Sequence, residues 1–339
     1  MGENRLSVPE PFSGGILLSY KCNSNCKHCM YACSPRWEAH WLSEEDAERI
    51  LAQLAVKLRG KYPHPGRIGI NYGIHFTGGE PFLNFELLLR VTEMARQLGI
   101  PSTFVETNCF WCRDDEATRK KLAELKDAGL DGILISVNPF IIERIPFERL
   151  ERAARISEEI FGGNVIIYQR FFYDQFKGLG LKGTLPFEEY LSKAGYGLYH
   201  VELIPAGRVP YKLGYLYRKY PAQRFFGQSC RRELIRDWHI HIDNYCHFIP
   251  GYCAGLSLGD ARDLDAICGG IDLDELPVLK ALLTDLEELY QLGREFGYQE
   301  REEGYISKCH LCVDIRRHLA RSGEFKELRP RQFYEHLED

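Results

Sequence analysis

The chain has 339 residues, which is enough for one large domain and a smaller second one. Its apolar fraction of 45% and charged fraction of 27% are those of an ordinary globular protein. The net charge of −5 gives no reason to expect a general polyanion-binding surface, so we expect no nucleic-acid partner. No apolar run approaches the roughly 20 residues that span a bilayer, and the first residues lack the apolar segment of a signal peptide. We therefore expect a cytoplasmic protein with no membrane contact.

Residues 1–13 are polar and interrupted by Pro and Gly, which predicts an irregular lead-in. The apolar stretch at 15–21 predicts a first strand. Ser43 and the three acidic residues after it predict the start of a helix, and apolar residues recur at helical spacing behind it.

The alternation of strand and helix continues to about residue 204. Further strands are predicted at 67–76, 101–106, 132–137, 164–172 and 199–204, with helices at 84–98, 114–128, 147–161 and 186–194. Six strand–helix units of this kind imply an α/β fold with parallel strands and right-handed crossovers. In closed or partial barrels of such units the chemistry lies at the C-terminal ends of the strands.

The pattern changes after about residue 225. Residues 238–250 alternate and turn like a β-hairpin, and 277–296 predict one helix, followed by further cysteines, a basic helix and a charged end. We therefore expect four parts: the lead-in at 1–13, a barrel at 14–225, a small α+β unit at 226–318 and a charged C-terminal tail at 319–339.

Twelve cysteines in a cytosolic protein indicate metal ligation rather than disulfides. Cys22, Cys26 and Cys29 follow the first strand in a C-x3-C-x2-C spacing. Four cysteines would close a zinc site or fill every iron of a 4Fe–4S cluster, whereas three leave one iron open. The alternative is a zinc site completed by His28 or Cys33.

A second motif, Gly78-Gly79-Glu80-Pro81, ends the second predicted strand. Two glycines let backbone carbonyls approach a ligand closely, and a carboxylate there can accept a hydrogen bond from an ammonium group.

Together the two motifs resemble those of the radical SAM superfamily. The resemblance implies a partial (β/α)6 TIM-like barrel, and a 4Fe–4S cluster whose open iron is chelated by S-adenosylmethionine (SAM). It also implies an enzyme that cleaves SAM reductively to a 5′-deoxyadenosyl radical, with a reduced flavodoxin or ferredoxin as electron donor. Polar residues near later strand ends would contact the SAM ribose and carboxylate: Thr107, Asn108, Ser136, Asn138 and Arg170. Arg208, in a segment that resembles a recurrent one of the family, is a further substrate or SAM contact.

The C-terminal cysteines resemble the twitch half of the SPASM-type extension, which holds one auxiliary 4Fe–4S cluster. The residues that fit best are Cys230, Cys253, Cys309 and Cys312, with Cys246 as the alternate for Cys253. The resemblance implies that this cluster accepts an electron from the substrate or binds it. A structural zinc site is the alternative.

The remaining cysteines and the hairpin histidines have open roles. Cys109 and Cys112 form a C-x2-C pair that is either inert, redox-active, near the substrate or a third metal site, and Cys33 and Cys268 are interpreted as bystanders. His239, His241 and His247 lie on the predicted hairpin, where His239 and His241 share one face, and all three are interpreted as neighbours of a site or as solvent-facing residues rather than ligands.

Peptide or protein modification is the substrate class that we favour, because it is the commoner use of this extension in the family. We expect no N-terminal leader-recognition domain, since the cysteine motif begins at residue 22, so a separate recognition protein would be required. Oxidation or cyclisation of a small molecule is the alternative. A non-catalytic iron–sulfur carrier or redox sensor is the rival class.

Overall fold

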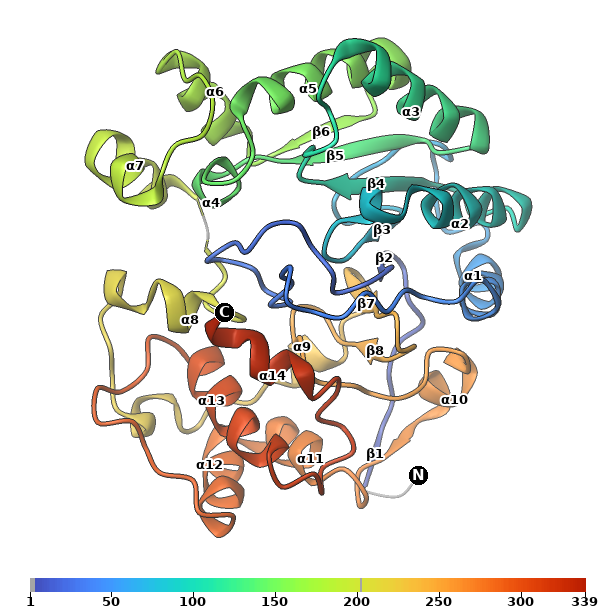
Figure 1. The fold of residues 1–339 in the computed structure, drawn as a ribbon. Helices are drawn as coiled ribbons and strands as arrows, with labels where there is room; N and C mark the ends of the chain where they lie inside the picture. The colour runs from blue at the N-terminus through green and yellow to red at the C-terminus, as the bar shows by residue number, and fades with distance from the viewer. Residues whose placement is uncertain (1–3, 202) are drawn as a thin grey trace.

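The computed structural model describes residues 4–201 and 203–339 (Figure 1). Its main sheet has the strand order β6-β5-β4-β3-β2-β7-β8. The strand bounds are β2 Gly14–Leu17, β3 Ile74–Thr77, β4 Thr103–Thr107, β5 Gly132–Ser136, β6 Val165–Tyr168, β7 Ile240–Ile242 and β8 Phe248–Ile249. The six strands from β6 to β7 run parallel, and β8 returns antiparallel. The predicted α/β class with a parallel sheet of partial-barrel type is confirmed.

Helices cover the outer face of this sheet, where Figure 1 shows them beside the strands. They are α1 Glu44–Leu58, α2 Phe85–Gln97, α3 Asp115–Ala128 and α5 Phe147–Phe161. The helices α4 Pro139–Ile142, α6 Arg170–Gly178 and α7 Phe187–Ala194 lie beyond the ends of β5 and β6. Local signals set their ends: Ser43 caps α1 by accepting from the Asp46 N–H, and Asp114 caps α3 in the same way. Gly129 ends α3 at a φ of 110°, which glycine adopts without strain.

The second half of the chain is mostly helical and lies below the sheet in Figure 1. Its helices are α8 Val209–Lys212, α9 Arg231–Leu234, α10 Leu264–Gly269, α11 Pro277–Thr284, α12 Leu286–Glu295, α13 Lys308–Ala320 and α14 Gln332–Glu335. A small separate sheet pairs β1 (Arg5–Leu6) with β9 (Ile271–Asp272), so the lead-in is tied to this half.

The sixth parallel strand is β7, not the segment 199–204 that the sequence predicts. There the chain forms a 3-10 helix, Gly195–His200, and residues 201, 203 and 204 are irregular, while residue 202 lies outside the described part. The alternating pattern of 199–204 is typical of a half-buried strand, but Tyr199 is 91% exposed. Among the described residues no strand pairs with the outer edge of β6, and β7 takes the place beside β2 as the sixth parallel strand.

Three other predicted boundaries are wrong. The strand predicted at 67–76 is only Ile74–Thr77, and the strand predicted at 164–172 ends at Tyr168, because α6 begins at Arg170. The helix predicted at 277–296 is interrupted at Asp285, whose extended backbone ends α11 and caps α12.

The C-terminal residues, predicted as a charged tail, are packed. Phe333 is buried against Gly255, and the Asp339 carboxylate accepts hydrogen bonds from Ser34 and Arg36 behind the first cysteine loop. Figure 1 shows the C-terminus beside α8, next to the dark-blue loop that follows β2.

Strand register places two inward rows of side chains in the sheet. His241, Gly15, His75 and Phe104 lie side by side on β7, β2, β3 and β4. Two residues further along, roughly 6.6 Å nearer the C-terminal strand ends, the row contains Thr77 and Glu106. Gly15 provides the room for the lower row, because a Cβ there would lie 2.4 Å from His75 Nε2 and 2.7 Å from His241 Cδ2.

A side chain at Gly14 should separate β7 from β2, because a Cβ there would lie 2.3 Å from the carbonyl oxygen of Ile240. We expect Gly14→Ala to lower the free energy of unfolding by about 1–3 kcal/mol, the usual cost of overpacking. Gly163→Ala is the control, since nothing lies within 4 Å of its Cβ position. Urea unfolding followed by circular dichroism measures both, and equal midpoints would contradict the prediction.

Candidate functional site

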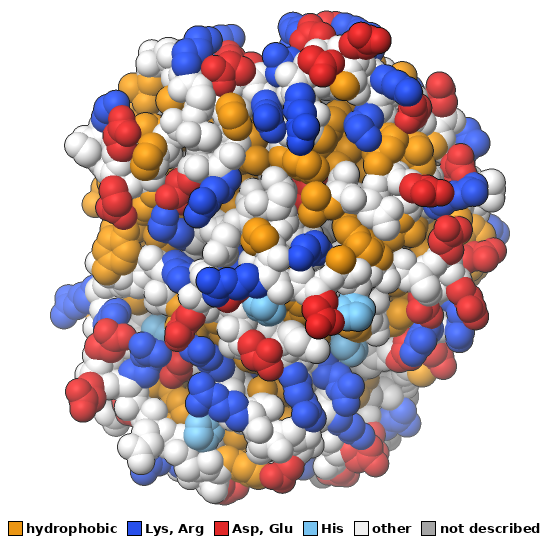
Figure 2. Space-filling view, in the orientation of Figure 1, with side chains coloured by type: hydrophobic (Ala, Val, Ile, Leu, Met, Phe, Trp, Pro, Cys, Tyr) orange, Lys and Arg blue, Asp and Glu red, His pale blue; other side chains and the backbone are white. Residues whose placement is uncertain are grey.

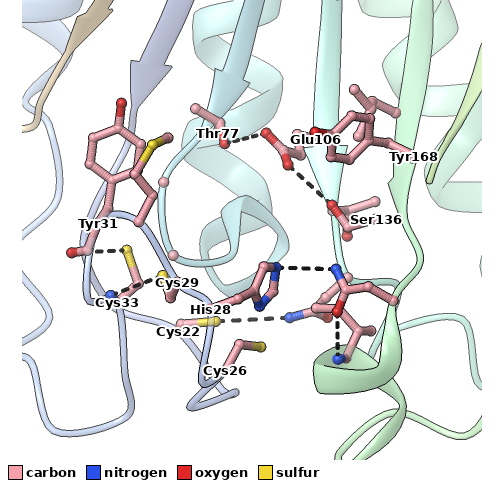
Figure 3. A pocket seen from close by; sticks show the side chains of 18 of the residues that line it. Cys22, Cys26, His28, Cys29, Tyr31, Cys33, Thr77, Glu106, Ser136 and Tyr168 are labelled. Atoms are coloured by element: carbon pink, nitrogen blue, oxygen red, sulfur yellow. Dashed lines mark hydrogen bonds between the residues drawn. The ribbon is translucent and has the colours of Figure 1, made fainter. Parts of the chain in front are cut away.

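A cavity of about 250 Å³ lies between the C-terminal strand ends and the loop that follows β2. Most of the residues predicted from the sequence for the first cluster and for SAM line it: Cys22, Cys26, Cys29, Gly78, Gly79, Thr107, Asn108, Ser136 and Asn138. Figure 3 shows the cysteine side chains on one side of this cavity and the strand-end residues on the other.

The three loop thiols lie in a buried environment that offers N–H groups to sulfur. The Ser24 N–H lies 3.3 Å from Cys22 Sγ, and the Cys33 N–H lies 3.3 Å from Cys29 Sγ. Burial raises the pKa of Cys22 far above its ordinary value and that of Cys26 to about 12. Against burial, a hydrogen bond from Cys33 and the nearby charge of Arg208 lower the pKa of Cys29 to about 6. Bound metal removes protons from coordinating thiols, so this loop fits an iron–sulfur cluster with N–H groups directed at its sulfur ligands.

The side chain of Arg208 holds the backbone of the cysteine loop through hydrogen bonds. Its side chain is 0% exposed and donates to the carbonyl oxygens of Ala32 (2.7 Å), Cys33 (2.9 Å) and, more weakly, Cys26 (3.4 Å). It also donates to His336 O at 3.0 Å. The sequence predicts Arg208 as a substrate or SAM contact; instead its guanidinium is used within the protein to hold the loop backbone.

Gly78 and Gly79 bring the second motif against the first. A Cβ on Gly79 would lie 1.9 Å from the Lys21 carbonyl oxygen, and one on Gly78 would lie 2.3 Å from Ser19 O. No other residue fits this approach, which places the end of β3 directly beside the start of the cysteine loop.

Glu80 does not project into the cavity. Its carboxylate accepts hydrogen bonds from Thr107 Oγ1 (2.8 Å), the Asn108 N–H (2.8 Å) and the Phe82 N–H (3.2 Å). Burial raises the pKa of Glu80 to about 7, although these hydrogen bonds oppose the shift. The structure therefore gives this carboxylate a bracing role between the ends of β3 and β4, where the sequence predicts a partner for an ammonium group.

The polar strand-end residues also brace the cysteine loop. Asn108 Nδ2 donates to Asn23 Oδ1 at 3.0 Å and lies 3.9 Å from Cys22 Sγ. Asn138 caps α4 through its oxygen, while its Nδ2 lies 3.1 Å from His28 Nε2. These side chains line the cavity and at the same time tie the loop to β4 and β5.

Glu106 is the carboxylate that faces the cavity, and the sequence analysis missed it. It accepts hydrogen bonds from Thr77 Oγ1 at 3.0 Å and Ser136 Oγ at 3.1 Å (Figure 3). Burial raises its pKa, and the two hydrogen bonds only partly oppose this. Its position in the sequence carried a signal: Glu106 is a charged residue inside a predicted apolar strand, one position before Thr107.

Arg170 lies away from the other predicted contacts. It is the first residue of α6, it is largely exposed, and its guanidinium pairs with Asp174 at 3.0 Å. It is not among the residues that line the cavity, so the structure does not bring it together with them.

The C-terminal cysteines form a second group. Cys230, Cys253, Cys309 and Cys312 lie close enough for their charges to interact, and burial with this mutual repulsion raises the pKa of Cys253 and Cys309 to about 12. Cys246 lies elsewhere, beside Asp46 and Arg262. The geometry thus places Cys253 in the group and leaves Cys246 outside it.

A buried arginine accompanies this second group as well. Arg316 donates to Ala254 O and Tyr334 OH, each at 3.1 Å, and its Nε has no hydrogen-bond partner. Burial alone would lower the pKa of Arg316, but Tyr334, Cys312 and Cys253 around it raise it. Cys312 and Cys253 are therefore neighbours whose ionisation would compensate the charge of this guanidinium.

No three His, Cys, Asp or Glu side chains in the described part of the chain are arranged to hold a single metal ion. A zinc ion requires ligands that converge on one point, whereas the cysteines of a cubane bind separate irons.

Cys109 and Cys112 lie behind the strand ends, outside the cavity lining. Both are fully buried, next to Trp111, which stacks on Phe82 at 3.9 Å between ring centroids. Their place favours an inert, packed pair among the roles left open by the sequence.

The surface in Figure 2 shows Lys and Arg side chains interspersed with Asp and Glu, as the modest net charge predicts. Across residues 4–201 and 203–339, no helix combines the length and apolar character that crossing a bilayer requires.

One segment of the chain is similar to a known protein family. Residues 16–140 match the family model of the radical SAM superfamily. A GTP 3',8-cyclase of Corynebacterium glutamicum (strain R) is 28% identical over 201 residues, which cover 57% of this chain and 49% of the cyclase. The chain thus spans about half the length of the curated relatives it matches.

Two solved structures have similar folds at low identity. BtrN in complex with AdoMet and 2-DOIA is 14% identical, with a TM-score of 0.43 over 81% of this chain and 88% of BtrN. Native anSMEcpe with bound AdoMet is 13% identical, with a TM-score of 0.43 over 96% of this chain and 95% of that one. At these scores neither structure indicates a substrate.

Residues 16–140 are therefore similar to the radical SAM superfamily. The matched segment contains the cysteine loop, Gly78-Gly79-Glu80 and the ends of β4 and β5.

Replacing the buried guanidinium should loosen the cysteine loop. Arg208→Lys keeps the charge but cannot reach the carbonyl oxygens on both sides of the loop, so we expect a loss of at least about 3 kcal/mol in unfolding free energy. The iron bound after anaerobic reconstitution should fall with it. Arg90→Lys, at an exposed surface pair, is the matched control. Normal stability and iron content in Arg208→Lys would contradict the bracing role.

Proposed function

We propose that this protein is a radical SAM enzyme that generates a substrate radical inside the cavity between the cysteine loop and the sheet. The observation that carries the proposal is the convergence of the buried thiols of Cys22, Cys26 and Cys29 with the Gly78-Gly79 backbone on one cavity. A cluster held by these cysteines supplies one-electron reductive cleavage of SAM when reduced, with a flavodoxin or ferredoxin as the proposed donor.

The residues of this chain would orient SAM and exclude water. The close approach of Gly78 and Gly79 to the loop leaves their backbone at the cavity wall, where carbonyl oxygens can accept from the SAM amino group. Thr107, Asn108, Ser136 and Asn138 are proposed to line the ribose and carboxylate side. Glu80 contributes by fixing the positions of Thr107 and Asn108.

We propose that Cys230, Cys253, Cys309 and Cys312 hold one auxiliary 4Fe–4S cluster in a twitch-type unit at 226–318, next to a barrel unit at 14–225. The mutual proximity of the four thiols and the uncompensated charge of Arg316 support this assignment. Four thiolates would complete the cluster, which suits an acceptor for the electron that a substrate radical gives up.

Modification of a peptide or protein remains the substrate class we favour, with oxidation or cyclisation of a small molecule as the alternative. The support for the first is the resemblance of the C-terminal cysteine pattern to the SPASM-type extension.

The enzyme proposal is tested by incubating anaerobically reconstituted protein with SAM and dithionite. The expected product is 5′-deoxyadenosine in the wild type, and more than a hundredfold less in Cys26→Ala, because that change removes an iron ligand. Cys246→Ala is the control, since Cys246 lies outside both cysteine groups. An intact cluster that forms no 5′-deoxyadenosine would favour the electron carrier or redox sensor instead.

Iron analysis tests the auxiliary cluster. Two cubanes require about eight iron atoms per chain, so Cys309→Ala combined with Cys312→Ala should lower the content to about four. Cys246→Ala should keep about eight. A wild-type content of about four iron atoms per chain that is unchanged in the double variant would contradict the proposal of a second cluster.

A further inference from the structure

The floor of the cavity, opposite the cysteine loop, carries three histidines that we name the histidine floor: His75, His239 and His241. Their ring centroids lie 5.0 to 5.8 Å apart, and all three line the cavity. His75 and His241 occupy neighbouring strands on either side of Gly15, whose missing side chain leaves space for both rings.

In each ring of the histidine floor, one nitrogen is hydrogen-bonded to a backbone group. His241 Nδ1 lies 3.3 Å from Gly251 O, and His239 Nδ1 lies 3.3 Å from Ile70 O. A carbonyl oxygen only accepts, so these nitrogens carry the protons. Burial lowers the pKa of His241 far below its ordinary value and that of His75 to about 3, so both rings are neutral at neutral pH.

The second nitrogen of a neutral ring is then a hydrogen-bond acceptor. In His75 the ring is hydrogen-bonded to the Gly14 backbone, and its buried Nδ1 has no partner. A buried acceptor without a partner loses free energy, which a ligand with a donor group would restore.

The charged residues of the cavity lining also favour a ligand that donates hydrogen bonds and carries a positive charge. Glu106, one inward row above His75, is the sole carboxylate among the described residues that line the cavity, and none of these residues is Lys or Arg. The donors to Glu106 are the neutral hydroxyl groups of Thr77 and Ser136, and no Lys or Arg among the described residues of the cavity lining faces this carboxylate. A phosphate-bearing substrate would meet this carboxylate and the ring lone pairs with no cation to neutralise it, and this disfavours GTP, after which the related cyclases are named.

We propose that the substrate of this enzyme presents a protonated amine or guanidinium to the histidine floor, between its ring nitrogens and the Glu106 carboxylate. This inference rests on the proposed function, because it takes the cavity as the substrate site. Such a group supplies only donors and one positive charge, which matches acceptors that lack partners and a carboxylate that lacks a counter-ion.

The test measures binding of matched probes to the reconstituted protein by calorimetry. Nα-acetyl-arginine methylamide is compared with the citrulline analogue, and Nα-acetyl-lysine methylamide with the norleucine analogue, so that each pair differs mainly in charge. Inorganic triphosphate is the anionic probe. We expect each cationic probe to bind at least tenfold more tightly than its neutral partner, and triphosphate not to bind in the cavity.

Two variants locate the site. Glu106→Gln removes the charge with little change in shape, and His241→Phe keeps a ring but removes the acceptor; both should abolish most of the tenfold preference. The control is His64→Asn, an exposed position outside the cavity, which should keep it. Glu106→Gln keeps the test valid if His241→Phe fails to fold.

The proposal is overturned by equal binding of charged and neutral probes, by absence of binding at millimolar concentrations, or by a preference that both variants retain. It is also overturned if Glu106→Gln weakens binding of SAM alone, because Glu106 would then belong to SAM. Wild-type formation of 5′-deoxyadenosine is measured alongside: its absence would overturn the proposed function, whereas its presence without any preference for cations would overturn only this inference.

Discussion

The guanidinium of Arg208 donates to carbonyl oxygens on both sides of Cys29 and to His336 near the C-terminus. A loop of closely spaced thiols has little apolar side-chain area of its own, so its shape depends on what its backbone groups contact. Here a single side chain from the segment before α8 supplies those contacts, with Gly207 at a φ of 57° lying directly against Met30 O. Arg316 stands in the same relation to the second cysteine group. Arg208 lies 4.0 Å from the Asp339 carboxylate, and Arg316 lies beside Cys253 and Cys312, so each arginine places a positive charge next to one cysteine group.

Two carboxylates at the strand ends have different roles: Glu80 holds the backbone in place, and Glu106 lines the cavity. Glu80, in the Gly78-Gly79-Glu80 run, is saturated by one hydroxyl and two backbone N–H groups and acts as a brace. Glu106 lies one strand away, accepts hydrogen bonds from two hydroxyl groups and has its carboxylate at the cavity. The sequence positions of Glu80 and Glu106 do not tell which of them faces the cavity. The hydrogen-bond donors around each carboxylate do: Glu80 accepts from three donors and Glu106 from two.

The sequence predicts what depends on local chemistry. Cysteine spacing, the caps at Ser43 and Asp114, and the glycines that let two strand ends meet all point to the observed arrangement. Sequence-based prediction is wrong where the structure of a segment depends on residues far away in the chain. Residues 199–204 alternate like a strand, but β7, which lies further along the chain, is the sixth parallel strand. Arg208 was predicted as a ligand contact, but backbone carbonyl oxygens that lie far from it in the sequence accept its hydrogen bonds. Glu106 was missed because its importance comes from the register of three strands rather than from its neighbours in the chain.

Because β7 pairs with β2, the main sheet contains strands from both halves of the chain. A fragment that stopped near residue 225 would leave β2 as an edge strand, with its backbone donors and acceptors exposed beside Gly14 and Gly15. Such an edge is a template for pairing between molecules and hence for aggregation. Separate expression of the first half of the chain would therefore have to include the hairpin at 240–249, and the two halves are expected to fold as one unit.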